Sequence, residues 1–182
     1  GLHFQKDSDS QIELQVCFRS CSYNDPNFLV LALISRVFDD GFTSRLQRVL
    51  REERGLVYSV ECRATSMSDL GTMDFDVTVR PEKVVEVTRI LLKEITTFAK
   101  EGPTESELAH IKKRYFFDLD SELDDPYKQV VRYAFPHLYS GEMSLQEERE
   151  LIESITAKKM LEVAEKVFEA KNLNLILVGP YT

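Results

Sequence analysis

Three segments of this chain alternate apolar and polar side chains with a period of two, which restricts them to half-buried β-strands. From Gln11 to Ser20 one parity is apolar and the other is polar. The segments that begin at Leu56 and Met73 repeat this alternation, and the turn at 69–71 between them predicts an antiparallel hairpin. A further apolar run at 173–178 predicts a closing strand.

The segments between these strands show helical periodicity and recognisable helix ends. Asp25-Pro26 predicts the start of a helix over 26–38, which is apolar on nearly every face and is therefore expected to be central and buried. Ser44 and Gln47 predict a capping box for a short helix over 45–53, which Gly55 would end. Five more helices are expected to open at Pro81, Thr104, Pro126, Ser144 and Thr156, with Pro136 kinking or ending the third.

These elements predict an α+β fold, with helices packed on one face of a largely antiparallel sheet. Residues 1–10 are polar and are expected to form a loose leader. The acidic pairs, such as Asp39-Asp40, are expected on caps and solvated surfaces. A chain of 182 residues suits one domain over 1–182.

Composition limits the partners and the compartment of this chain. A formal net charge of -8 argues against nucleic acid and against anionic membranes, since both require clustered Lys and Arg. No apolar run is long enough to cross a bilayer. Cys17, Cys21 and Cys62 fit no metal pattern and are expected to be free thiols, which favours a reducing compartment such as the cytoplasm. The abrupt start at Gly1 leaves open a signal peptide or domain upstream.

The histidines argue against a catalytic metal in this chain. His3, His110 and His137 are the whole set, and none lies in His-Glu-x-x-His or in its inverted form. Without two ligands on one helix face, neither a catalytic residue nor a metal site is expected here.

Arg51 and Tyr58 are the residues with the clearest potential for binding. Arg51 falls in the last turn of the predicted helix and Tyr58 at the start of the next strand, and a turn at Gly55 would fold one toward the other. Both are hydrogen-bond donors, and two donors aimed at a peptide carbonyl could hold an extended substrate. The alternative is that Arg51 complements the helix dipole while Tyr58 packs in the core.

The stretch around these residues resembles the second domain of pitrilysin/insulinase-type zinc metallopeptidases. The specific part is Ser44-Arg45-Leu46 followed by Leu50-Arg51-Glu52-Glu53-Arg54-Gly55-Leu56-Val57-Tyr58-Ser59-Val60. Weaker matches are the helix opening at 103–108 and the strand that ends in Val178-Gly179-Pro180. The run of glycines that many members carry before Ser-Arg-Leu is replaced here by Asp39-Asp40-Gly41-Phe42-Thr43.

The resemblance implies a non-catalytic, substrate-binding domain of a two-domain zinc metalloendopeptidase. Zinc would then lie in a partner domain, on the same polypeptide or on a separate subunit, and Arg51 and Tyr58 would bind peptide substrate. Homo-oligomers are also compatible with it. Two other functions stay open: a structural or assembly subunit of the same fold without proteolytic activity, and a self-standing peptide-binding module.

Overall fold

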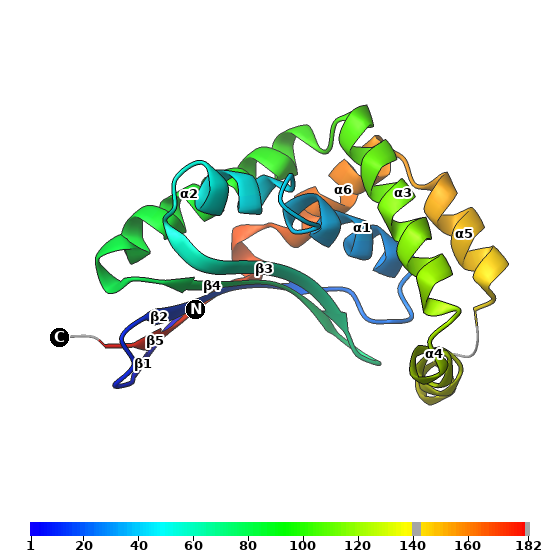
Figure 1. Cartoon of the computed structure of the whole chain (residues 1–182), viewed down its shortest axis with the longest axis horizontal. Coiled ribbons are helices and arrows are strands. Elements are labelled where there is room, and N and C mark those ends of the chain that lie inside the picture. The colour runs from blue at the N-terminus through cyan, green and yellow to red at the C-terminus, as the bar shows by residue number, and fades with distance from the viewer. Residues whose placement is uncertain (140–142, 181–182) are drawn as a thin grey trace.

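The computed structural model describes residues 1–139 and 143–180 as a sheet covered on one face by helices (Figure 1). The strands are β1 (Leu2–Lys6), β2 (Ile12–Ser20), β3 (Val57–Ser66), β4 (Gly71–Val79) and β5 (Leu173–Gly179). The α-helices are α1 (Phe28–Phe38), α2 (Val84–Glu101), α3 (Glu105–Glu122), α4 (Pro126–Tyr139), α5 (Leu145–Ser154) and α6 (Ala157–Val167). A π-helix η1 (Gln47–Glu52) and the 3₁₀ turns η2 (Pro81–Lys83) and η3 (Ala170–Asn172) complete the set.

The sheet has the order β1-β5-β2-β4-β3, and only the β1–β5 pair is parallel. This arrangement confirms the α+β class and the largely antiparallel sheet. In Figure 1 the helices gather above one face of the sheet, whereas α4 is seen end-on at the lower right, away from the strands. The predicted hairpin is β3–β4, with Ser66 opposite Gly71 beside the turn.

The prediction of a loose leader over residues 1–10 is wrong for its first half. Residues Leu2 to Lys6 pair in parallel with Leu175 to Gly179 at the edge of the sheet. Every β1 side chain is exposed, and the alternation of Leu2 and Phe4 with His3 and Gln5 covers too few residues to predict a half-buried strand. Its order comes from backbone pairing, and the Gly1 amino group adds a 3.1 Å hydrogen bond to the Leu173 carbonyl.

Five phenylalanines join the sheet to the helices and form the centre of the core. The Phe38 ring, at the end of α1, lies 5.1 Å from Phe75 of β4 and 5.0 Å from Phe98 of α2, between ring centroids. Phe168, just after α6, lies 5.1 Å from Phe18 of β2 and 6.0 Å from Phe38. Phe38, Phe75 and Phe98 are fully buried. Helix α1 buries seven side chains and is the central helix expected.

Several predicted helix ends are confirmed and two are corrected. The capping boxes Thr104/Glu107 and Ser144/Glu147 both form. Helix α1 begins at Phe28 rather than at Pro26, because the Asp25 carboxylate accepts from the Asn27 amide at 2.8 Å and forms a turn first. Pro136 lies inside α4, which continues to Tyr139.

The three cysteines carry thiols, and none of them is in a disulfide bond. Cys17, Cys21 and Cys62 are free thiols, as predicted. Burial raises the pKa of the Cys17 thiol to about 12, so this thiol is a poor nucleophile near neutral pH. Within residues 1–139 and 143–180, none of the helices combines the length and apolar character needed to span a bilayer.

The phenylalanine cluster predicts an asymmetry between two neighbouring residues. Phe38→Ala should lower the free energy of unfolding by about 3–5 kcal/mol, because it opens a cavity at a fully buried site. Phe42→Ala, four positions later at a side chain that is 71% exposed, should change it by less than about 0.5 kcal/mol. Urea unfolding of both variants checks this, and equal losses would contradict the central role of the cluster.

Candidate functional site

The segment from Ser44 to Val60 turns a helix sharply into an edge strand. In η1 the Glu53 amide donates to the Arg48 carbonyl at 2.9 Å, a five-residue spacing that widens the helix, as is frequent at functional sites. Gly55 then adopts φ +58°, where a side chain would be strained. The Leu56 amide donates a hydrogen bond to the Leu50 carbonyl at 2.9 Å, so the chain reverses directly after Arg51.

The capping box predicted for this helix does not form. The Ser44 hydroxyl donates to the Gly41 carbonyl at 2.7 Å, and η1 has no side-chain cap. The Gln47 side chain points elsewhere, donating to the Asp39 carboxylate at 3.1 Å and to the Val60 carbonyl at 2.9 Å. The Ser44 hydroxyl and the Gln47 side chain are therefore engaged in other hydrogen bonds and do not form the predicted capping box.

Tyr58 is the extra residue of a β-bulge at the start of β3. Val57 is opposite Val79 and Ser59 is opposite Thr78, so Tyr58 has no partner residue in β4. Alternation placed Tyr58 on the same face as the buried Val60, but the bulge interrupts that parity. The Tyr58 side chain is 76% exposed, which overturns the alternative that it packs in the core.

Arg51 and Tyr58 are both available to a ligand in the isolated domain. Both side chains are exposed and lie on either side of the reversal at Gly55. Within the described residues, no hydrogen bond or ion pair of the Arg51 guanidinium or the Tyr58 hydroxyl is found. Convergence of the two donors on one point stays a prediction.

The free edge of β3 beside these residues is already hydrogen-bonded. The Asp39 carboxylate accepts from the Cys62 amide at 3.1 Å, and Gln47 donates to the Val60 carbonyl. An extended peptide therefore cannot pair with β3 over 60–62 without displacing both side chains. Any peptide held here must be contacted by side chains instead.

The solvated role predicted for Asp39-Asp40 is wrong. Besides the Asp39 contacts, the Asp40 carboxylate is only 11% exposed and accepts from Arg36 at 3.0 Å and from Arg114 at 3.1 Å. The pair therefore connects α1, α3 and β3 directly before the site. Nothing in the spacing of two adjacent acids predicts which distant arginines they meet.

Arg45 anchors the start of the site segment and was missed as a functional position. Its guanidinium makes two hydrogen bonds to the Glu107 carboxylate, at 2.7 and 2.8 Å, and one to the Gly102 carbonyl at 3.2 Å. It also lies 5.1 Å from the centroid of the Phe98 ring. Arg45 thereby ties η1 to the α2–α3 connection, a contact that only the tertiary structure reveals.

The residues of this chain do not suit a zinc ion. His3, His110 and His137 lie on β1, α3 and α4, which are three separate elements. The part of the chain that the structure describes holds no group of three His, Cys, Asp or Glu side chains able to bind a metal.

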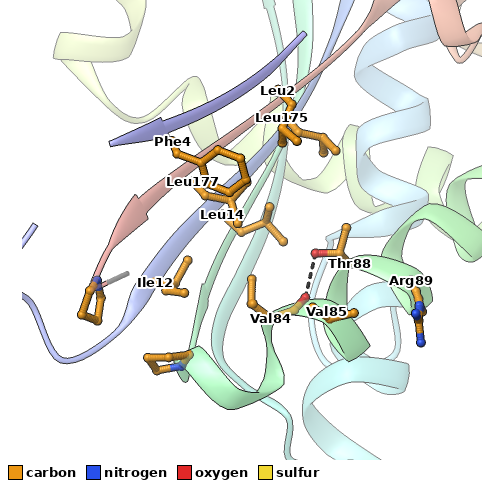
Figure 2. A pocket seen from close by; sticks show the side chains of 12 residues that line it. Leu2, Phe4, Ile12, Leu14, Val84, Val85, Thr88, Arg89, Leu175 and Leu177 are labelled. Atoms are coloured by element: carbon orange, nitrogen blue, oxygen red, sulfur yellow. Dashed lines mark hydrogen bonds between the residues drawn. The ribbon is translucent and has the colours of Figure 1, made fainter. Parts of the chain in front are cut away.

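Apart from the Arg51–Tyr58 turn, an apolar groove lies between the β1–β5 edge and the start of α2 (Figure 2). Apolar side chains from three strands line it, and in Figure 2 Arg89 points away from them. Exposed Leu2, Phe4 and Val85 form its rim. The groove lacks converging polar groups to orient a peptide backbone, so the Arg51–Tyr58 turn is the better candidate site.

The described residues present two donors beside a protected sheet edge, and comparisons give the family. Residues 2–115 match the family described as "Peptidase M16 inactive domain". The chain is 26% identical over 152 residues to an uncharacterized zinc protease of Mycobacterium tuberculosis, covering 83% of this chain and 34% of that relative. It therefore spans about a third of the length of this relative.

Two solved structures share the fold. The peptidase M16 inactive domain from Pseudomonas fluorescens superposes with a TM-score of 0.89 at 21% identity, over 100% of this chain and 44% of that one. A chain of complex III2 from Candida albicans gives 0.87 at 18% identity, over 98% and 45%.

This chain belongs to the peptidase M16 inactive domain family. The finding confirms the resemblance that the Arg51–Tyr58 block suggested. The matching relatives are named as zinc proteases, whereas the matching family is described as an inactive domain.

The Arg45 anchor predicts a pH dependence of stability. Partial burial opposes ionisation of Glu107, but hydrogen bonds from Arg45 and the Thr104 amide outweigh it and lower the pKa from 4.5 to about 2. Because the folded-state pKa is depressed, the stabilisation is complete above pH 4.5 and is lost as the pH falls toward 2. Glu107→Gln should flatten the fall of the urea midpoint across this window, whereas Glu105→Gln in the same turn should not. Identical slopes would contradict the anchor.

Proposed function

We propose that this domain helps to enclose and bind peptide substrate in a zinc-dependent metalloendopeptidase, with Arg51 and Tyr58 donating hydrogen bonds to the peptide backbone. The observation that carries the proposal is that both donors are exposed on one reversal of the chain, without partners among the described residues. A phenol held outside the core at a bulge forgoes packing, and ligand contact gives a reason for the exposed placement of Tyr58 beside Arg51.

The surroundings of the two donors support this role. The site segment is fixed at its start by Arg45 and at the strand by Gln47 and Asp39. Since these contacts hold the backbone, less conformational freedom is lost when the two side chains meet a substrate carbonyl. The edge of β3 is occupied over 60–62, so side-chain donors are the groups left to contact a peptide.

The division of labour between domains follows from the zinc chemistry. The partner domain would hold the zinc ion that activates water, and this chain's residues would orient the peptide. A donor placed on the scissile carbonyl would also stabilise the oxyanion that forms there. The complete enzyme is thus expected to need both domains, and this chain alone to lack peptidase activity.

Substitution at the two donors tests the proposal in the complete protein. Arg51→Ala or Tyr58→Phe should lower kcat/KM for peptide by roughly 10- to 100-fold while the zinc content is unchanged, because a donor to the carbonyl is lost. Tyr58→Phe removes only the hydroxyl and keeps the ring. Arg54→Ala, at another exposed arginine on the same turn, is the matched control and should leave turnover unchanged. Unchanged turnover in the Arg51 and Tyr58 variants would refute the assignment.

A structural role without proteolysis is the second candidate, favoured by the likeness to the complex III2 chain. Under this function the complete protein would bind no zinc and cleave no peptide. Measurement of zinc stoichiometry and peptide turnover in the complete protein separates the two, since one zinc per protein with turnover supports the peptidase and the absence of both supports the structural subunit.

A further inference from the structure

Helix α4 exposes a row of apolar and aromatic side chains to solvent. Its exposed positions Tyr127, Val130, Tyr133 and Ala134, which we call the α4 stripe, are uncharged. At 100° per residue they cover an arc of roughly 120°. Tyr127 is 76% exposed, Val130 is 65% exposed and Tyr133 is 50% exposed. A surface helix ordinarily turns such an arc toward its own core.

The opposite, polar face of α4 makes the contacts with this domain. Arg132 forms an ion pair with Glu148 of α5, which also accepts from the Tyr115 hydroxyl. The Gln129 side chain donates to the Glu122 carbonyl at 2.8 Å at the end of α3. Hydrogen bonds and an ion pair therefore hold this side of the helix, where Val131 and Pro136 also line a hollow together with Phe28 and Leu29. The stripe side chains lie on the exposed side instead.

Helix α4 packs against this domain without the α4 stripe. Among its described side chains only Pro136 is buried. A helix of 14 residues is marginal in water without an apolar face packed against a neighbour. Figure 1 shows α4 apart from the sheet, at the periphery of the helical layer. The stripe therefore stays exposed in this domain and can be covered by a surface outside it.

We infer that the α4 stripe docks on the zinc-binding partner domain; this inference rests on the proposed function. M16 inactive domains pair with a catalytic domain, in the same chain or in another. The chain spans 34% of the M. tuberculosis relative and 44% of the P. fluorescens structure, so more than half of each lies outside the matching region. Pairing must cover part of this domain, and the stripe is an apolar surface that this domain leaves exposed.

The α4 stripe lies on an element other than the one that carries the candidate site. The stripe is on the helix 126–139, and Arg51 and Tyr58 are on the reversal between η1 and β3. One surface would thus hold the partner domain while the other contacts substrate. This separation lets the two proposals fail independently.

Hydroxyl-radical footprinting of the complete protein, or of its two-subunit complex, tests the docking. Val130→Glu places a charge at the centre of the stripe and should raise labelling of Tyr127 and Tyr133 roughly tenfold, as expected when a central interface residue is lost. Ala134→Glu lies in the same arc and provides a second test should the first variant fold poorly. Val85→Glu, at a valine that is 59% exposed on α2, is the matched control and should leave both tyrosines protected.

The outcomes separate the partner domain from other occupants. Strong labelling of Tyr127 and Tyr133 in the unsubstituted protein, or an equal rise with Val85→Glu, would overturn the inference. Loss of a homodimer with intact contact to the zinc-binding domain would also overturn it, by assigning the stripe to a second copy. If the Arg51 and Tyr58 variants keep full turnover while Val130→Glu uncovers the tyrosines, the docking stands and the substrate role fails.

Discussion

The burial of Phe38 among four other phenylalanines is the contact on which the candidate site depends. Phe38 is the last residue of α1, so its position fixes Asp39 and Asp40 directly after it. Phe98 belongs to the same cluster, and the Arg45 guanidinium lies 5.1 Å from its ring centroid. A single apolar cluster therefore positions the acidic pair before the site and the arginine that begins it. The polar contacts can be specific because the backbone that carries them is held by packing.

Three polar side chains that frame the candidate site are engaged in tertiary contacts. Asp39, Gln47 and Arg45 each bond a backbone or side-chain group from another part of the chain. By contrast, Arg51 and Tyr58 are exposed on either side of the reversal at Gly55. A purely structural turn would need Gly55 for its conformation, but it would need neither a guanidinium nor a phenol at these places.

The sequence predicted much of the fold because its strongest signals are local. Alternation located β2, β3 and β4, helical spacing located α1, and capping boxes located the starts of α3 and α5. Strand β1 was missed because its side chains are all exposed and its order comes from pairing with β5. For the site, the role of Arg51 and Tyr58 stays a prediction, and alternation wrongly placed Tyr58 on the same face as buried residues. One extra residue at a bulge changes which face a side chain occupies, and composition carries no sign of it.

The hydrogen bonds that join Asp39 and Gln47 to β3 also affect the tendency of the domain to self-associate in concentrated solution. A strand at the end of a sheet exposes backbone groups that can pair with the same strand of another molecule, which is a common start of aggregation. Here the groups of Val60 and Cys62 are already engaged, and the opposite edge strand β1 has only five residues. Asp39 and Gln47 therefore limit self-association through this edge, and substitution at either position is expected to increase it.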